Sequence, residues 1–246
     1  LVIEHQGKTY QRVTEVLDCW FESGSMPYGQ QHYPFENKEV FEANFPANFI
    51  CEGLDQTRGW FYTLVVIAQA LFDKPAFHNC VVNGLILAED GKKMSKRLKN
   101  YPDPTQMLDQ YGADAIRLYM LNSPAVRGED LRFSEKGLVE TTRTLLLPLW
   151  NALAFLTTYA RIDGWEPTSE NLELPRNNPL DRWILSKLAG LIDEVRSQMD
   201  LYDLNRSVAP FVGFIDLLTN WFIRRSRRRF WKACLLYTSP SPRDRG

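Results

Sequence analysis

The sequence is poor in the residues that build disulfide frameworks and local metal sites. Its 246 residues include 4 cysteines and 3 histidines. The cysteines lie far apart, at positions 19, 51, 80 and 234, so no Cys-x-x-Cys pair occurs, and the histidines are equally scattered. We therefore expect no disulfide scaffold and no metal site, and this cysteine usage is typical of a reducing compartment.

Long apolar runs and an excess of one charge are missing as well. The longest apolar run, from Trp60 to Phe72, is much shorter than the roughly 20 residues that cross a bilayer. No basic segment followed by an apolar run opens the chain, so no secretory signal is expected. Lys+Arg 29 against Asp+Glu 30 leaves a net charge of -1, and 14 glycines and 14 prolines are too few for a low-complexity chain. We expect a cytoplasmic globular protein with no membrane span.

The first part of the chain is typical of an α/β domain. Phe49–Cys51 is a short strand candidate, and Asp55 is suited to cap a helix expected over 60–69. The apolar, β-branched run Cys80–Leu87 follows as a second strand. Strand, helix and strand with short connections predict a βαβ unit and a parallel sheet within residues 1–133.

From residue 134 onward the sequence predicts helices. An asparagine cap and a proline at 178–179 open a helix whose apolar face extends over 180–199. A second helix is expected over 204–222, where Pro210 either bends it or marks its true start.

One turn concentrates the chemistry. The segment Gly91–Arg97 places four cations within six positions, just beyond an apolar strand, where α/β sheets bind ligands. A mobile loop with two lysines suits a polyphosphate whose charge shifts during a reaction. The segment is not a P-loop, because six residues separate Gly84 from Gly91 and Lys92 is followed by another lysine. A solvated basic loop is the plainer alternative.

Five stretches together resemble the class I aminoacyl-tRNA synthetases, and among them the isoleucyl-tRNA synthetases. Lys93–Arg97 is similar to the Lys-Met-Ser-Lys-Ser loop of this class, with arginine in the last place. The segment Asp55–Trp60 favours isoleucyl over valyl and leucyl enzymes. The resemblance covers residues 10–233. Besides the loop, the stretches that carry it are Trp20-Phe21-Glu22-Ser23-Gly24, Glu52-Gly53-Leu54-Asp55-Gln56-Thr57-Arg58-Gly59-Trp60, Leu180-Asp181-Arg182-Trp183-Ile184 and residues 220–231.

The resemblance implies a fold and a function. The fold would be the second half of a Rossmann-like, parallel-sheet catalytic domain over 1–133, followed over 134–233 by the start of a truncated α-helical anticodon-binding bundle. Residues 234–246 break the pattern and are either a native disordered tail or a cloning or sequencing scar. The full enzyme would activate L-isoleucine with ATP and Mg²⁺ and pass the acyl group to tRNA(Ile). Valyl or leucyl specificity, or a non-catalytic RNA-binding module, are the alternatives.

The resemblance also implies roles for single residues. Lys93 and Lys96 would be catalytic and would bind the ATP phosphates, with Ser95 beside them. The residues that would contact the aminoacyl-adenylate are Glu52, Gly53, Asp55, Gln56, Trp20 and Trp60.

Each of these positions also has a plainer interpretation. Glu52 and Asp55 would be a surface carboxylate and a helix cap, Trp20 and Trp60 would be ordinary core aromatics, and Ser95 would supply a turn hydroxyl.

A basic run lies near the end of the second region. Residues 224–232 hold six cations and no acid, interleaved with Phe230 and Trp231. On a helix, such a run either tracks a phosphate backbone or forms a solvated face whose aromatic side chains turn to the core. Because the resemblance places it in the anticodon-binding bundle, the candidate tRNA-binding residues are Arg224, Arg225, Arg227, Arg228 and Arg229.

One element of the class has no match. Synthetases of this class carry His-x-Gly-His early in the nucleotide fold, and the nearest approach here is His5-Gln6-Gly7-Lys8, which we predict to be a turn. We therefore expect the chain to be a fragment of a larger enzyme, with the missing phosphate element before Leu1, and to be inactive by itself.

Overall fold

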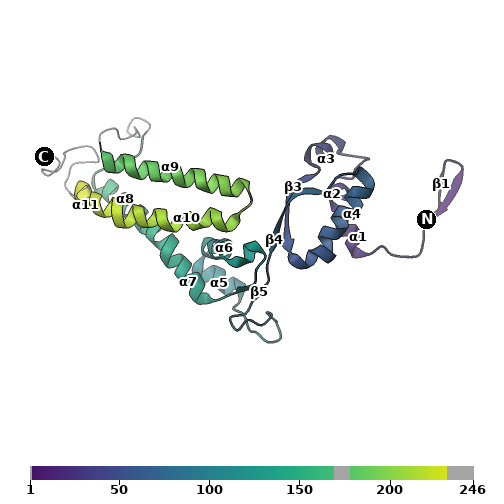
Figure 1. The fold of residues 1–246 in the computed structure, drawn as a ribbon, viewed down its shortest axis with the longest axis horizontal. Coiled ribbons are helices and arrows are strands. Elements are labelled where there is room, and N and C mark those ends of the chain that lie inside the picture. Colours follow the sequence, from purple (N-terminus) through teal and green to yellow (C-terminus); the bar gives the residue numbers. More distant parts are fainter. Residues whose placement is uncertain (1, 169–177, 232–246) are drawn as a thin grey trace. The chain divides into compact units, whose positions relative to one another are not determined.

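The computed structural model describes residues 2–168 and 178–231, and the chain divides into two compact units, 1–83 and 84–246. The elements of the first unit are β1 (Val2–His5), β2 (Lys8–Gln11), α1 (Cys19–Gly24), α2 (Met26–Gly29), α3 (Lys38–Asn44), β3 (Ala47–Gly53), the 3₁₀-helix η1 (Leu54–Arg58), α4 (Trp60–Phe72) and β4 (Phe77–Asn83) (Figure 1).

The expected βαβ unit is present in the first unit. β3 and β4 pair in parallel, with Ala47 opposite Phe77 and Gly53 opposite Asn83, and α4 connects them. Leu64, Ala68 and Ala76 form the buried cluster beside this pair. The predicted parallel sheet and its crossover helix are therefore confirmed.

The beginning of α4 differs from the prediction. The chain first makes the 3₁₀-helix η1, and Gly59 stands at the cap of α4. The Trp60 backbone N–H is bound by the Gln56 side chain at 2.9 Å rather than by Asp55. The prediction that Asp55 caps α4 was wrong, because Asp55 lies in the 3₁₀-helix η1, too far from the first turn of α4.

The segment His5-Gln6-Gly7-Lys8 is a turn, as predicted. It joins β1 to β2 in an antiparallel hairpin in which His5 faces Lys8. Gln6 and Gly7 both have positive φ, 51° and 73°, which is the backbone of a type I′ hairpin turn.

The expected strand over 80–87 is broken. β4 ends at Asn83, and β5 (Ile86–Leu87) pairs with β6 (Leu131–Arg132) in a different sheet. The Gly84 N–H donates to the Ala125 carbonyl at 2.8 Å, and a Cβ on Gly84 would lie 1.9 Å from the Glu129 carbonyl oxygen. This close backbone approach redirects the chain, and only glycine fits there.

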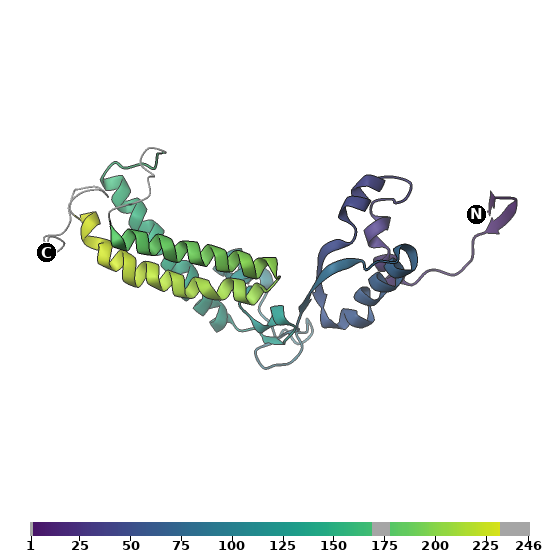
Figure 2. The same ribbon diagram turned by 45° about the horizontal axis from the view of Figure 1, so that its top comes forward.

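The second unit is mainly helical. Besides β5 and β6 it contains α5 (Pro104–Tyr111), α6 (Ala113–Leu121), η2 (Pro124–Arg127), α7 (Glu135–Thr141), the π-helix η3 (Thr142–Leu146), α8 (Leu147–Ile162), α9 (Pro179–Asp200), α10 (Leu204–Asp216), the π-helix η4 (Leu217–Ile223) and α11 (Arg224–Trp231). α9 and α10 lie side by side in both views (Figures 1 and 2).

The predicted start of α9 is confirmed in detail. The Asn178 side chain accepts from the Leu180 N–H at 2.9 Å, and Pro179 occupies the first turn. Pro210 lies inside α10, which begins at Leu204 behind the cap of Asp203, so it does not mark a helix start. Among described residues after 134 there are helices and no strand, as predicted. The tail 234–246 lies outside the described residues.

One helical run is more apolar than the sequence analysis indicated. In the described part of the chain, Glu135–Ile162 (α7, η3 and α8 together) is long and apolar enough to cross a membrane by length and composition, with a mean hydropathy of 1.2 over an 18-residue window. A single such helix is weak evidence of a span. The absence of a membrane span therefore stays a prediction.

Candidate functional site

The carboxyl end of β3 gathers the predicted carboxylates. Glu52 and Gly53 are its last residues, and Asp55 follows in η1. A Cβ on Gly53 would lie 2.7 Å from Asp55 Oδ1, so the Asp55 carboxylate reaches back over the Gly53 backbone. Glu52 Oε1 accepts from the Gly53 N–H at 3.0 Å. Two acidic groups thus lie together against the Gly53 backbone where a parallel strand ends, a position at which α/β folds bind ligands.

The two predicted tryptophans lie on neighbouring helices beside Gly59. Atoms of the Trp20 ring would lie 3.1 and 3.2 Å from a Cβ at Gly59, and Gln56 Oε1 would lie 2.8 Å from the same point. The Trp60 indole N–H donates to the Ser23 carbonyl on α1 at 3.1 Å. Trp20 is 42% exposed, whereas Trp60 is half-buried. The structure thus brings Trp20, Gln56 and Trp60 together.

An apolar cavity of about 110 Å³ lies in the same unit. Of the six residues predicted to contact the adenylate, Trp60 lines it. Its other walls come from α2, α3, β3 and α4 and include Met26, Phe41, Ile50 and Leu64. Apolar walls with few polar groups are typical of a pocket for a hydrophobic side chain.

The basic loop lies in the second unit and starts as a tight turn after β5. The Gly91 N–H donates to the Ala88 carbonyl at 2.8 Å, and the Ala88 N–H donates to the Lys92 carbonyl at 2.9 Å. Gly91 has φ +81°, a backbone conformation that favours glycine. Lys93 is bridged to Leu87, which ties the start of the motif to the sheet.

The lysines of the loop differ in their partners. Lys92 Nζ lies 3.3 Å from Asp90 Oδ2, and its backbone N–H donates to the same carboxylate at 3.0 Å. This backbone hydrogen bond lowers the pKa of Asp90 below its ordinary value, helped by the Lys92 ammonium. Lys93 and Lys96 are exposed and form no ion pair among the described residues. The loop therefore presents two ammonium groups to solvent, as binding a polyphosphate would require.

Sequence analysis missed Asn100, which closes this loop. Its Oδ1 accepts from the Ser95 N–H at 2.9 Å, and its Nδ2 donates to the Lys93 carbonyl at 3.2 Å. The available signal was an asparagine five positions after the serine, since asparagine side chains bind nearby backbone in turns.

The arginines of α11 separate into two groups. Arg224, Arg225, Arg227 and Arg228 are exposed, and the Arg225 guanidinium lies 4.8 Å from the centre of the Trp221 ring. Arg229 instead donates twice to Asp181 of α9, at 2.5 and 2.8 Å. Arg229 thus crosslinks two helices, while the other four face solvent.

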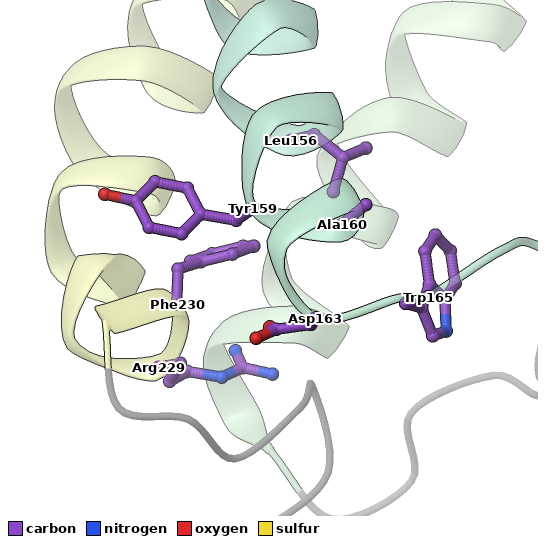
Figure 3. Close-up of a pocket in the computed structure, with 7 residues that line it drawn as sticks. All are labelled: Leu156, Tyr159, Ala160, Asp163, Trp165, Arg229 and Phe230. Atoms are coloured by element: carbon purple, nitrogen blue, oxygen red, sulfur yellow. The ribbon is translucent and has the colours of Figure 1, made fainter.

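A small pocket of about 20 Å³ lies beside this crosslink, lined by Leu156, Tyr159, Ala160, Asp163, Trp165, Arg229 and Phe230 (Figure 3). The Phe230 ring packs against Phe155 and Tyr159 of α8, with ring centres 5.0 and 6.0 Å apart. The end of α11 therefore combines an aromatic contact to the bundle with an outward basic face.

Comparison with family models gives two matches. Residues 2–133 match "tRNA synthetases class I (I, L, M and V)", and residues 181–239 match "Anticodon-binding domain of tRNA ligase". The first match spans more than half of the chain.

Curated relatives that match the chain carry the name isoleucine–tRNA ligase. The protein of Protochlamydia amoebophila is 65% identical over 93% of this chain, and that of Treponema denticola is 58% identical over 92%. The chain spans 22% of the length of each of these relatives.

Solved structures show the same fold at low sequence identity. A methionyl-tRNA synthetase of Mycobacterium tuberculosis bound by methionyl-adenylate aligns with a TM-score of 0.70 and 21% identity, covering 92% of this chain and 42% of that one. A LeuRS of Agrobacterium radiobacter K84 in a complex with tRNA and LeuAMS aligns with a TM-score of 0.66 and 18% identity, over 91% of this chain and 29% of that one. The expected fold class, a parallel-sheet synthetase region followed by helices, is thereby confirmed.

Proposed function

The chain belongs to the class I tRNA synthetases (I, L, M and V), and we propose from this premise that it is a segment of an isoleucine–tRNA ligase. The whole protein would activate L-isoleucine with ATP and transfer the isoleucyl group to tRNA(Ile). The observation that carries the choice of amino acid is the 65% identity to a ligase of that name over 93% of this chain.

Activation needs positive charge at the phosphates of ATP, and the basic loop supplies it. A carboxylate oxygen of isoleucine attacks the α-phosphorus of ATP and forms the new P–O bond of isoleucyl-adenylate. The bond from the α-phosphorus to the oxygen that bridges to the β-phosphorus breaks, and pyrophosphate leaves with its electron pair. Lys93 and Lys96 would bind the phosphates, with the Ser95 hydroxyl beside them, and would stabilise the charge that develops on the leaving group. Because no side-chain nucleophile is required, the contribution of these residues is positioning and charge stabilisation.

The cluster at the end of β3 suits the other half of the adenylate. Glu52 and Asp55 carry the charge to bind the isoleucine ammonium and the ribose hydroxyls, and the Gly53 backbone permits close approach. Gln56 would hold Trp60 in place. Trp60, which lines the apolar cavity, would wall the pocket for the isoleucine side chain, with Trp20 beside it at Gly59.

Mg²⁺ would enter with ATP as part of the substrate. Within 2–168 and 178–231, no group of three His, Cys, Asp or Glu side chains could hold a metal ion. No step of the proposed mechanism is therefore assigned to a protein-bound metal.

The helical region after residue 133 would serve tRNA(Ile). The exposed arginines Arg224, Arg225, Arg227 and Arg228 offer an electrostatic surface for the RNA backbone, whereas Arg229 would contribute by holding α11 against α9. We also propose that the functional boundary lies near residue 133, with the catalytic region before it and the anticodon-binding region after it, and that the ligase is cytoplasmic.

The test is amino-acid-dependent ATP–pyrophosphate exchange by the full-length ligase. Isoleucine, valine, leucine and methionine are each supplied as sole substrate, and kcat/KM is compared. We expect the highest value with isoleucine and charging of tRNA(Ile) by the same protein. A higher kcat/KM with valine, leucine or methionine would assign the chain to another member of the class, and no exchange with any of the four would contradict the proposal.

A further inference from the structure

Asn100 holds the basic loop through its side chain. One amide oxygen and one amide nitrogen bind the backbone on either side of Met94, accepting from Ser95 and donating to Lys93. The amide therefore binds this segment as a neighbouring strand would, with one acceptor and one donor. Asn100 is half-buried, whereas Lys93 and Lys96 are exposed.

A second set of bonds extends this order to Lys96. The Ser95 carbonyl accepts from the N–H groups of Leu98 and Lys99, at 3.1 and 2.9 Å. Ser95 is thus fixed from both sides: its N–H by the Asn100 side chain and its carbonyl by the turn that contains Lys96. Loss of the Asn100 amide would loosen the backbone between Lys93 and Ser95, from which the turn that contains Lys96 continues.

We propose that Asn100 is a positioning residue for adenylate formation, a role that rests on the proposed function of the loop. Asn100 would not touch ATP. It would hold the backbone from which Lys93 and Lys96 extend, so that less conformational freedom is lost when their ammonium groups meet the phosphates.

The variants Asn100→Ala, Asn100→Asp, Lys96→Ala and the Asn100→Ala/Lys96→Ala double variant are made in the full-length ligase. Isoleucine-dependent exchange gives kcat, and the KM values for isoleucine and ATP are recorded alongside. Asn122→Ala, at the exposed C-terminal cap of α6, is the matched control.

We expect Asn100→Ala to lower kcat about tenfold, the value of two modest hydrogen bonds, with KM for isoleucine unchanged. Asn100→Asp should be no better, because it keeps the acceptor for Ser95 but sets an oxygen against the Lys93 carbonyl. In the Lys96→Ala background the same substitution should cost less, because one of the two lysines that Asn100 positions is already gone. Asn122→Ala should match the wild type.

An unchanged kcat in Asn100→Ala while Lys96→Ala is slow would overturn this inference alone. Equal losses from Asn100→Ala in both backgrounds would also overturn it, since they would show an effect on the fold that does not pass through Lys96. Full activity in Lys96→Ala would overturn the proposed role of the loop, and this inference with it.

Discussion

Three side chains lie close to the backbone of Gly59: those of Trp20, Gln56 and Trp60. The Trp20 ring and the Gln56 amide oxygen both lie near it, and Trp60 follows it directly. Gln56 also caps α4 through the Trp60 N–H. A residue that orders both a helix end and an aromatic wall should affect stability and substrate binding together.

Replacing Gln56 by alanine should therefore have two effects. Loss of the cap should destabilise α4 by about 1 kcal/mol, and a less ordered Trp60 should raise KM for isoleucine, with kcat little changed. Steady-state exchange measures the second effect, and hydrogen exchange of the α4 amides measures the first. Gln56→Glu keeps an oxygen for the Trp60 N–H and should preserve the protection of the α4 amides. An unchanged KM for isoleucine in Gln56→Ala would contradict the proposal that Trp60, held by Gln56, forms a wall of the isoleucine pocket.

At the scale of elements, local patterns predicted much and missed what depends on distant residues. The βαβ unit and the start of α9 were predictable because apolar spacing and the Asn178 cap are local signals. The break after β4 was not, because Gly84 is redirected by close approach to Glu129, far along the chain. The motif that contains Lys93 and Lys96 was recognisable in the sequence. The two hydrogen bonds from the Asn100 side chain to the backbone of this loop are seen only in the folded structure.

The ion pair between Asp181 of α9 and Arg229 of α11 can be tested directly. The Asp181 side chain is 11% exposed and that of Arg229 is 31% exposed, so breaking the pair leaves a charge that is partly buried. Asp181→Ala should lower the local stability of both helix ends by about 2 kcal/mol, seen as faster hydrogen exchange in the first turn of α9 and in α11.

The controls for this pair are on the same helices. Arg228→Ala, on the exposed face of α11, should leave the exchange rates almost unchanged. The double variant Asp181→Ala/Arg229→Met should regain part of the loss, because removing both charges is less costly than stranding one. Equal protection in Asp181→Ala and the wild type would show that the ion pair does not hold the helices together.

At the scale of the whole molecule, the described residues leave much apolar surface exposed. Each of the three sheets has two strands in this part of the chain. Phe35, Trp150 and Ile162 are 80%, 68% and 72% exposed. Unpaired strand edges and apolar patches of this kind promote association.

The isolated 246-residue polypeptide should therefore bind a hydrophobic dye and sediment as a heterogeneous mixture. It should also lack isoleucine-dependent exchange, because the His-x-Gly-His phosphate element has no match in it. Analytical ultracentrifugation and dye fluorescence test the first two expectations. A single sharp monomer with a cooperative thermal transition would contradict the prediction, as would exchange clearly above a blank without protein.

The most direct test of the central claim, that the basic loop binds ATP phosphates during activation, compares Lys96→Ala with Lys92→Ala in the full-length ligase. Both lysines are exposed, but Lys92 is paired with Asp90, whereas Lys96 forms no ion pair among the described residues. The measurement is the single-turnover rate of isoleucyl-adenylate formation. Loss of a charge contact made mainly in the transition state should slow Lys96→Ala by about a hundredfold, or ~3 kcal/mol, with KM for isoleucine nearly unchanged and Lys92→Ala close to the wild type. Equal effects at the two lysines, or a Lys96→Ala defect confined to KM for ATP, would instead identify the segment as an ordinary solvated basic loop.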